Sequence, residues 1–153
     1  MPIEQMSLVE GEVYSPSSTQ RVTNRALSTG HIVYRIKDYG RIFVVNIDSN
    51  KGRSYKELPA LTGKPLFPIL SICTVASKTT GNFHVWVALE KPHTRKDRCF
   101  LSLLMGSDPV RELILMDKRN PWYTYETQYS DEIIDQWLDR YDLHSEVELV
   151  QQT

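Results

Sequence analysis

The sequence predicts an α+β protein in which helices pack on one face of a mostly antiparallel sheet. Apolar runs rich in β-branched residues recur at strand length, at residues 41–48, Ile69–Ala76 and residues 83–89. A short turn that contains glycine separates the last two runs, which is typical of an antiparallel hairpin. One amphipathic helix is clear near the C-terminus, where apolar residues recur at helical spacing at Ile133, Ile134, Trp137, Leu138 and Tyr141.

The composition indicates a single globular domain. The chain has 153 residues, of which 41% are hydrophobic and 24% are charged, and this is sufficient for a hydrophobic core. We expect residues 1–20 to form a loosely held polar arm, residues 21–145 to form the domain, and residues 146–153 to form a polar tail.

Charge, apolar runs and cysteines restrict the partners and the location. The formal net charge is -1, so a nucleic-acid site has to be a local basic groove. No apolar run approaches the roughly 20 residues that span a bilayer, and the N-terminus lacks signal-peptide features, so no membrane partner is expected. Cys73 and Cys99 lie in apolar contexts without metal-ligand spacing, which predicts reduced core thiols in a cytoplasmic protein.

The elements predicted for the first half are apolar runs bounded by turn residues. The strand at residues 41–48 has apolar residues on both faces until Asn46 and Asp48, so we expect it to be central in the sheet. The turn before it predicts a hairpin with the preceding strand. In order, the elements are a short strand at residues 12–14, a helix at residues 21–27, a strand at residues 31–36, the turn at residues 37–40 and the strand at residues 41–48.

The second half opens with a long connection, residues 51–68, which is typical of a functional loop. Thr94 is predicted to cap a helix that Gly106 ends, and Asp108 before Pro109 is typical of another helix start. Ser130 is predicted to cap the last helix. In order, the elements are a hairpin of strands at Ile69–Ala76 and residues 83–89, a helix at residues 95–105, a short helix or strand at residues 113–116, the last helix, and a frayed polar end after residue 144.

Three polar residues interrupt these apolar elements and are candidates for chemistry. Asp48 ends a buried strand and is followed by Asn50 in a turn, which suits a hard cation held by oxygen ligands. The alternative is that Asp48 only closes the turn. His84 lies within a strand, where the alternative is a hydrogen-bonded core histidine. Asp108 has the alternative role of a plain helix cap.

Taken in order, these motifs form a recognisable series that covers about residues 40–125. An apolar strand ends at an acid-x-acid position, a histidine strand follows a small polar turn, and a third acid comes later. The series resembles the catalytic core of the archaeo-eukaryotic primase superfamily, and within it the plasmid and phage replicases, which are replication-initiator primases. Four segments carry the resemblance: Asp48-Ser49-Asn50, the run from Gly81 through His84 to Leu89-Glu90-Lys91-Pro92, Ser107-Asp108-Pro109, and Lys118-Arg119-Asn120-Pro121-Trp122.

The resemblance implies a primase core of RNA-recognition-like architecture and a two-metal mechanism of nucleotidyl transfer. Asp48 and Asp108, with Asn50 at the family's second acidic position, would bind Mg²⁺ or Mn²⁺, and two such ions would bridge the triphosphate. His84 would contact the phosphates of the incoming nucleotide as a hydrogen-bond donor.

Basic and aromatic side chains near these motifs are candidates for further contacts. Positive charge for phosphates or for the template backbone would come from Lys78, Arg111, Lys118 and Arg119. A solvated basic surface is the alternative for these residues. Bases of a single strand would stack on Trp122, Tyr123 and Tyr125. Packing against the core is the alternative for these aromatic residues.

Two departures separate the chain from this family. The second acidic position is occupied by Asn50, which supplies an oxygen but no charge, so metal affinity should fall. The helical segment and DNA-binding domain that such replicases add after the core have no counterpart, which argues against origin recognition by this chain alone.

Two functions follow from the resemblance. We expect a template-directed nucleotidyltransferase that makes or extends primers on single-stranded DNA from nucleoside triphosphates, in plasmid or phage DNA replication. The alternative is a catalytically inactive primase-like fold that binds nucleic acid, or a host replication or defence protein, as a regulator or inhibitor. Both require that Asp48, His84 and Asp108 converge on one open sheet face, and an unrelated α+β binding module is the third possibility.

Overall fold

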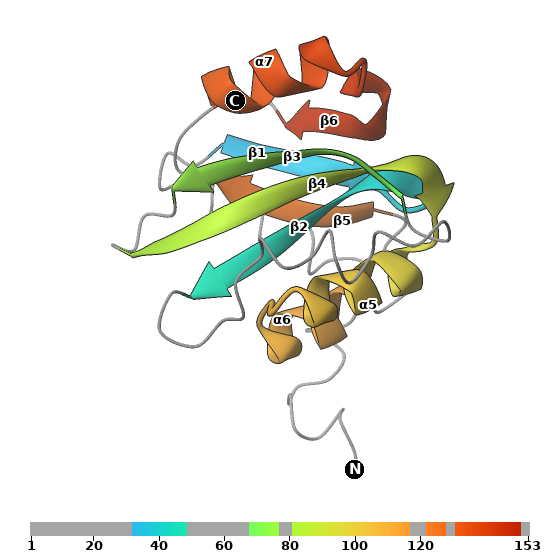
Figure 1. Cartoon of the computed structure of the whole chain (residues 1–153), viewed down its shortest axis with the longest axis vertical. Helices are drawn as coiled ribbons and strands as arrows, with labels where there is room; N and C mark the ends of the chain where they lie inside the picture. Colours follow the sequence, from blue (N-terminus) through green and yellow to red (C-terminus); the bar gives the residue numbers. More distant parts are fainter. Residues whose placement is uncertain (1–31, 49–67, 77–80, 117–121, 128–130, 151–153) are drawn as a thin grey trace.

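The apolar runs of the chain form two three-stranded antiparallel sheets, which three α-helices flank (Figure 1). The structure, a computed structural model, describes residues 32–48, 68–76, 81–116, 122–127 and 131–150. The α+β class with antiparallel pairing is therefore confirmed. The strands are β1 (Ile32–Lys37), β2 (Gly40–Asp48), β3 (Ile69–Ala76), β4 (Asn82–His93), β5 (Trp122–Thr127) and β6 (Val147–Val150), and the helices are α5 (Arg95–Leu104), α6 (Pro109–Leu115) and α7 (Asp131–Arg140).

The first sheet has the strand order β2-β4-β3, so β4 is its central strand. The predicted hairpin of β3 and β4 is confirmed. The prediction that residues 41–48 form the central strand is wrong, because β2 is an edge strand. Its two apolar faces are nevertheless buried, and its outer edge is covered: the Val44 carbonyl accepts a hydrogen bond from Ser102 Oγ at 3.4 Å, and the Asn46 N–H donates one to Ser107 Oγ at 3.2 Å.

The second sheet has the order β5-β1-β6, with β1 paired to both neighbours. The predicted hairpin of β1 with β2 is wrong, because the tight turn between them passes the chain from one sheet to the other. Two strands of this sheet were not expected. β5 lies in the aromatic segment, and β6 lies within the stretch assigned to a polar, frayed tail, where Leu149 pairs with Tyr34.

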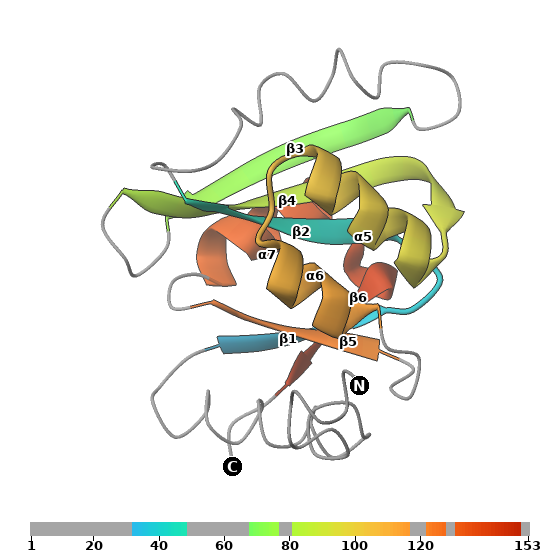
Figure 2. The same ribbon diagram turned by 90° about the horizontal axis from the view of Figure 1, so that it is seen from below.

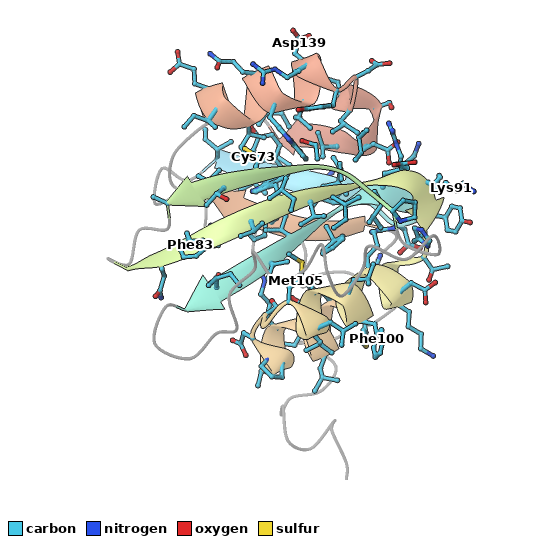
Figure 3. The ribbon with its side chains drawn as sticks, viewed as in Figure 1. Cys73, Phe83, Lys91, Phe100, Met105 and Asp139 are labelled. Atoms are coloured by element: carbon cyan, nitrogen blue, oxygen red, sulfur yellow. The ribbon has the colours of Figure 1, made fainter. Side chains whose placement is uncertain are left out.

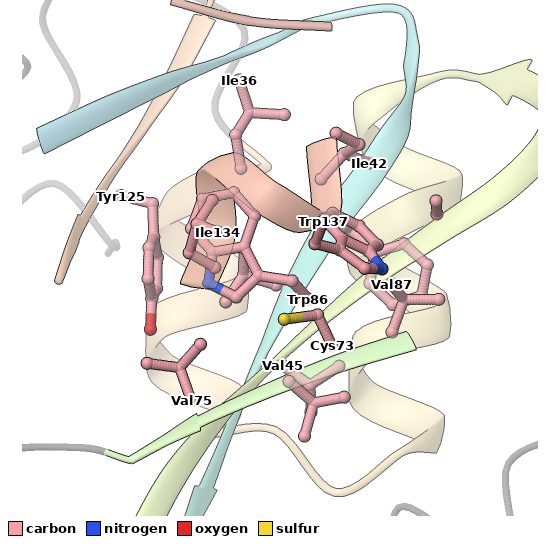
Figure 4. Packing of buried hydrophobic residues seen from close by; sticks show 14 of the residues in the cluster. Ile36, Ile42, Val45, Cys73, Val75, Trp86, Val87, Tyr125, Ile134 and Trp137 are labelled. Carbon is pink, nitrogen blue, oxygen red and sulfur yellow. The ribbon is translucent and has the colours of Figure 1, made fainter. Parts of the chain in front are cut away.

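The two sheets face each other (Figure 2), and aromatic side chains pack between them (Figure 4). The ring of Trp86 on β4 lies 5.2 Å from that of Tyr34 on β1 and 5.4 Å from that of Tyr125 on β5, both in edge-to-face geometry. The helices lie on opposite sides of the molecule, α5 and α6 on one and α7 on the other, so the expectation of helices on one face is wrong. Trp137 anchors α7 by donating from Nε1 to Ser71 Oγ at 2.7 Å.

The ends of the middle helices follow the predicted capping residues. Thr94 Oγ1 accepts from the Asp97 N–H at 3.2 Å and begins α5. Gly106, with a φ of 96°, ends it in a Schellman arrangement, since the Ser107 N–H bonds the Ser102 carbonyl and the Gly106 N–H bonds the Leu103 carbonyl. Asp108 then caps α6.

A buried arginine joins α5 to both sheets. Arg98 has no exposed surface, and its guanidinium donates to the backbone carbonyls of Lys37, Asp38, Gly40 and His93. It therefore holds the turn between β1 and β2 against the end of β4. Next to it, Arg95 forms an ion pair with Asp38 at 2.7 Å.

Several expectations fall outside the described residues. These are the N-terminal arm, the elements at residues 12–14 and 21–27, and nearly all of the connection at residues 51–68. No helix within the described ranges is long and apolar enough to cross a membrane.

Candidate functional site

Two of the candidate residues, Asp48 and His84, lie on the paired strands β2 and β4, toward the end of β2. In the antiparallel register, Asn46 lies opposite His84 and Asp48 lies opposite Asn82. Because residues directly opposite each other project to the same face of a sheet, Asn46 and His84 share a face. Asp48 continues β2 two positions further, and its side chain is outside the described part of the structure.

Asp108 reaches the same end of the sheet through its neighbour in the chain. Ser107 is 4% exposed, and its Oγ accepts the backbone N–H of Asn46. Asp108 therefore stands one residue from a direct contact with β2, next to the strand pair that carries Asp48 and His84. Its own Oδ1 accepts from the Val110 N–H at 3.0 Å, and the side chain is exposed. Asp108 thus acts as the helix cap that was the alternative role.

His84 and Arg111 converge on one aromatic ring. The imidazole of His84 lies 5.0 Å from the Tyr125 ring, edge to face, and the guanidinium carbon of Arg111 lies 4.7 Å from the centroid of the same ring. Nδ1 of His84 and Nε of Arg111 are both buried and have no hydrogen-bond partner among the described residues. A strand and a helix thus each bring a buried nitrogen without a partner among the described residues to the same aromatic ring.

The protonation state of His84 follows from this setting. Burial, and secondarily the positive charge of Arg111, lowers the pKa of His84 from 6.5 to about 4. The imidazole is therefore neutral at pH 7, and it can donate from one nitrogen and accept at the other. Arg111 supplies the fixed positive charge of the pair.

A buried carboxyl group lies behind these residues, and sequence analysis did not single it out. Glu112 is 1% exposed and accepts a hydrogen bond from the Ser107 hydroxyl at 2.6 Å. Burial raises its pKa to about 7, against the opposing effects of the Ser107 hydrogen bond and the Arg111 charge. In the sequence, Glu112 is an ordinary acid in the first turn of a short helix, so only its burial distinguishes it.

The remaining predicted residues are placed as follows. Tyr125 is 2% exposed, in agreement with the packing alternative. Trp122 and Tyr123 belong to β5, but their side chains lie outside the described part. The other predicted contacts also fall outside the described residues, namely Asn50, Lys78, Lys118 and Arg119.

The described residues contain no group of three or more His, Cys, Asp or Glu side chains that could hold a metal ion. Of the three expected ligands, only Asp108 has a described side chain. The two cysteines are free and buried, which confirms their assignment to the core. Burial raises the pKa of both thiols, so neither is a reactive thiolate at neutral pH.

The fold and these residues define an α+β protein with a polar, partly buried site between two antiparallel sheets, beside α6. The expectation of an open sheet face is wrong for His84, because its ring lies against Tyr125 of the second sheet. Comparison with known proteins identified no matching family model, no matching curated protein and no matching solved structure.

Proposed function

We propose that the chain is a primase-like nucleotidyltransferase whose incoming nucleotide binds where β2, β4 and α6 meet, between the two sheets and not on the open sheet face that the resemblance led us to expect. The observation that carries the proposal is the convergence of His84 and Arg111 on the Tyr125 ring, each with a buried nitrogen that lacks a partner among the described residues. Buried polar nitrogens are normally hydrogen-bonded, and a phosphate group supplies acceptors for both.

The two residues have complementary roles in this proposal. Arg111 attracts the triphosphate by charge, and neutral His84 donates a directional hydrogen bond. Burial beside the Tyr125 ring restricts both side chains, so less conformational entropy is lost when the nucleotide binds. Lys78, Lys118 and Arg119 remain candidates for the template backbone, and Trp122 and Tyr123 for stacking of bases.

Asp48 and Asp108 are the proposed ligands of Mg²⁺ or Mn²⁺, with Asn50 as a neutral oxygen donor. The ion supplies stabilisation of charge that develops on the triphosphate. The hydrogen bond from Asn46 to Ser107 supports this assignment, because it holds the segment that carries Asp108 against the strand that carries Asp48.

Primer synthesis on single-stranded DNA tests the proposal. The assay contains mixed nucleotides with Mg²⁺ or Mn²⁺ and compares the wild type with Asp48→Ala. Asp135→Ala is the matched control, because Asp135 is an exposed acid on α7, away from the site. We expect metal-dependent product from the wild type and the control, and none from Asp48→Ala. Product that persists in Asp48→Ala would rule out this active site.

A second candidate is the catalytically inactive primase-like fold that binds a protein or nucleic acid as a regulator. Exposed apolar side chains on α5 and α6 favour it, among them Phe100, which is 56% exposed and points away from the sheets (Figure 3). Exposed apolar side chains that lie together mark contact sites more often than isolated ones do. The others on these helices are Leu104, Val110, Leu113 and Ile114. Nucleotide or DNA binding without product under either metal would favour this candidate.

A further inference from the structure

Ser107 and Glu112 form a buried polar pair beside the site. The Ser107 hydroxyl donates to Glu112 Oε2 at 2.6 Å, and its oxygen accepts the Asn46 N–H at 3.2 Å. The Ser107 hydroxyl has a single proton, and it donates that proton in the hydrogen bond to Glu112. The lone pairs of the Ser107 oxygen therefore face β2. Glu112 thus fixes the direction in which Ser107 bonds the strand.

The backbone at Ser107 is fixed independently of that pair. Its N–H closes the end of α5 by bonding the Ser102 carbonyl, and the next residue, Asp108, begins α6. The corner between the two helices is therefore determined on both sides. Ser107 is the point at which this corner holds the edge of β2.

Protection of a sheet edge does not by itself require a buried acid. Ser102 bonds the same edge at the Val44 carbonyl through a hydroxyl alone. Burial of a carboxyl group costs free energy unless its hydrogen bonds offset the lost hydration. Of the two serines, only Ser107, which bonds Asn46, has a buried acid as its partner. Asn46 is the residue opposite His84.

We propose that Ser107, oriented by Glu112, is a positioning residue that fixes the end of β2 relative to His84 and so sets the geometry of the nucleotide site. This inference rests on the function proposed above, because that function is what makes the site a nucleotide site. Ser107 and Glu112 act through the strand and do not touch the nucleotide.

The test compares two serines that bond the same strand edge. Ser107→Ala removes the hydroxyl that accepts from the Asn46 N–H, and Ser102→Ala removes the hydroxyl that donates to the Val44 carbonyl. We expect Ser107→Ala to shift the NMR resonance of the His84 imidazole and to weaken binding of dATP with Mn²⁺ roughly tenfold. Ser102→Ala should leave the His84 resonance in place and change the affinity less than about twofold.

Variants of Glu112 separate orientation from simple packing. Glu112→Gln keeps an oxygen that accepts the Ser107 proton, whereas Glu112→Leu removes it. We expect Glu112→Leu to reproduce the effects of Ser107→Ala and Glu112→Gln to retain most of the wild-type behaviour. Equal effects of the two serine variants on His84, or equal effects of the two Glu112 variants, would overturn the inference. If the wild type binds no dATP, the proposed function fails, while the His84 resonances still decide whether Ser107 positions the strand.

Discussion

Tyr125 shows at the scale of a single residue how packing and electrostatics combine in this protein. Its ring contributes to the core through Trp86, and it also contacts His84 and Arg111. The face of an aromatic ring carries partial negative charge and its edge partial positive charge, so a guanidinium over the ring is stabilised. The arrangement holds the positive charge of Arg111 near the His84 imidazole. Burial already disfavours the protonated form of that imidazole, and the nearby charge disfavours it further.

This arrangement predicts the titration of His84. Its imidazole should titrate near pH 4, because burial and the Arg111 charge lower its pKa to about 4. Arg111→Gln should raise that pKa only part of the way toward 6.5, since burial is the larger cause and remains. Two-dimensional NMR of the histidine ring carbons measures both. Arg140→Gln, at an exposed position on α7, is the control. A His84 midpoint near 6.5 in the wild type would contradict the burial seen here.

At the scale of elements, Arg98 determines how one strand leads into the next sheet. Its guanidinium bonds the backbone carbonyls of the β1–β2 turn and the end of β4. The planar fork of arginine presents five donors in fixed directions, and a lysine ammonium cannot match them. The turn can therefore bend sharply between sheets without leaving its carbonyls unpaired.

Arg98→Met should lower the free energy of unfolding by about 3 kcal/mol, because buried carbonyls lose their donors. Arg98→Lys should cost less than Arg98→Met but remain destabilising. Urea denaturation measures both values. Arg140→Met, at an exposed position on α7, should stay within about 0.5 kcal/mol of the wild type. A similar loss at both arginine positions would mean that the turn does not depend on Arg98.

The elements also show what the sequence can predict and where it fails. Local patterns gave β3, β4, α5 and the start of α6, because hairpin turns, Thr94, Gly106 and Asp108 act within a few residues of their own position. The partners of β1 were not predictable in this way. β5 and β6 are separated from β1 by most of the length of the chain. A short strand such as β6 also becomes stable only when a partner strand supplies its hydrogen bonds.

The site also combines features that the sequence can predict locally with features that depend on long-range contacts. The residue types at His84, Arg111 and Asp108 stand out in the sequence, but these residues are brought near one another by contacts between distant segments, such as the Asn46–Ser107 hydrogen bond, which spans 61 positions. Glu112 carries no local signal, because acids are common in the first turn of a helix. Only the packing of α5 and α6 against β2 makes it a buried group.

At the scale of the whole molecule, Glu112 and His84 give opposite dependences of stability on pH. Glu112 has its pKa raised from 4.5 to about 7, so between these pH values the folded state keeps a proton that the unfolded state has released. The free energy of unfolding therefore falls as pH rises through this window. His84 has its pKa lowered from 6.5 to about 4, so here the unfolded state holds the extra proton and the free energy of unfolding rises with pH.

The contributions of Glu112 and His84 to the pH dependence of the unfolding free energy nearly cancel between pH 4.5 and 6.5. Variants that remove one group at a time should reveal the contribution of each. Relative to the wild type, Glu112→Gln should gain about 3 kcal/mol of unfolding free energy as pH rises from 4.5 to 7. His84→Gln should lose a similar amount relative to the wild type from pH 4 to 6.5. Urea denaturation across this range measures both slopes, with Glu132→Gln and His144→Gln as exposed controls. If both buried-site variants follow the wild-type curve in parallel, neither group titrates differently in the folded and unfolded states, and the polar site between the sheets is open to water.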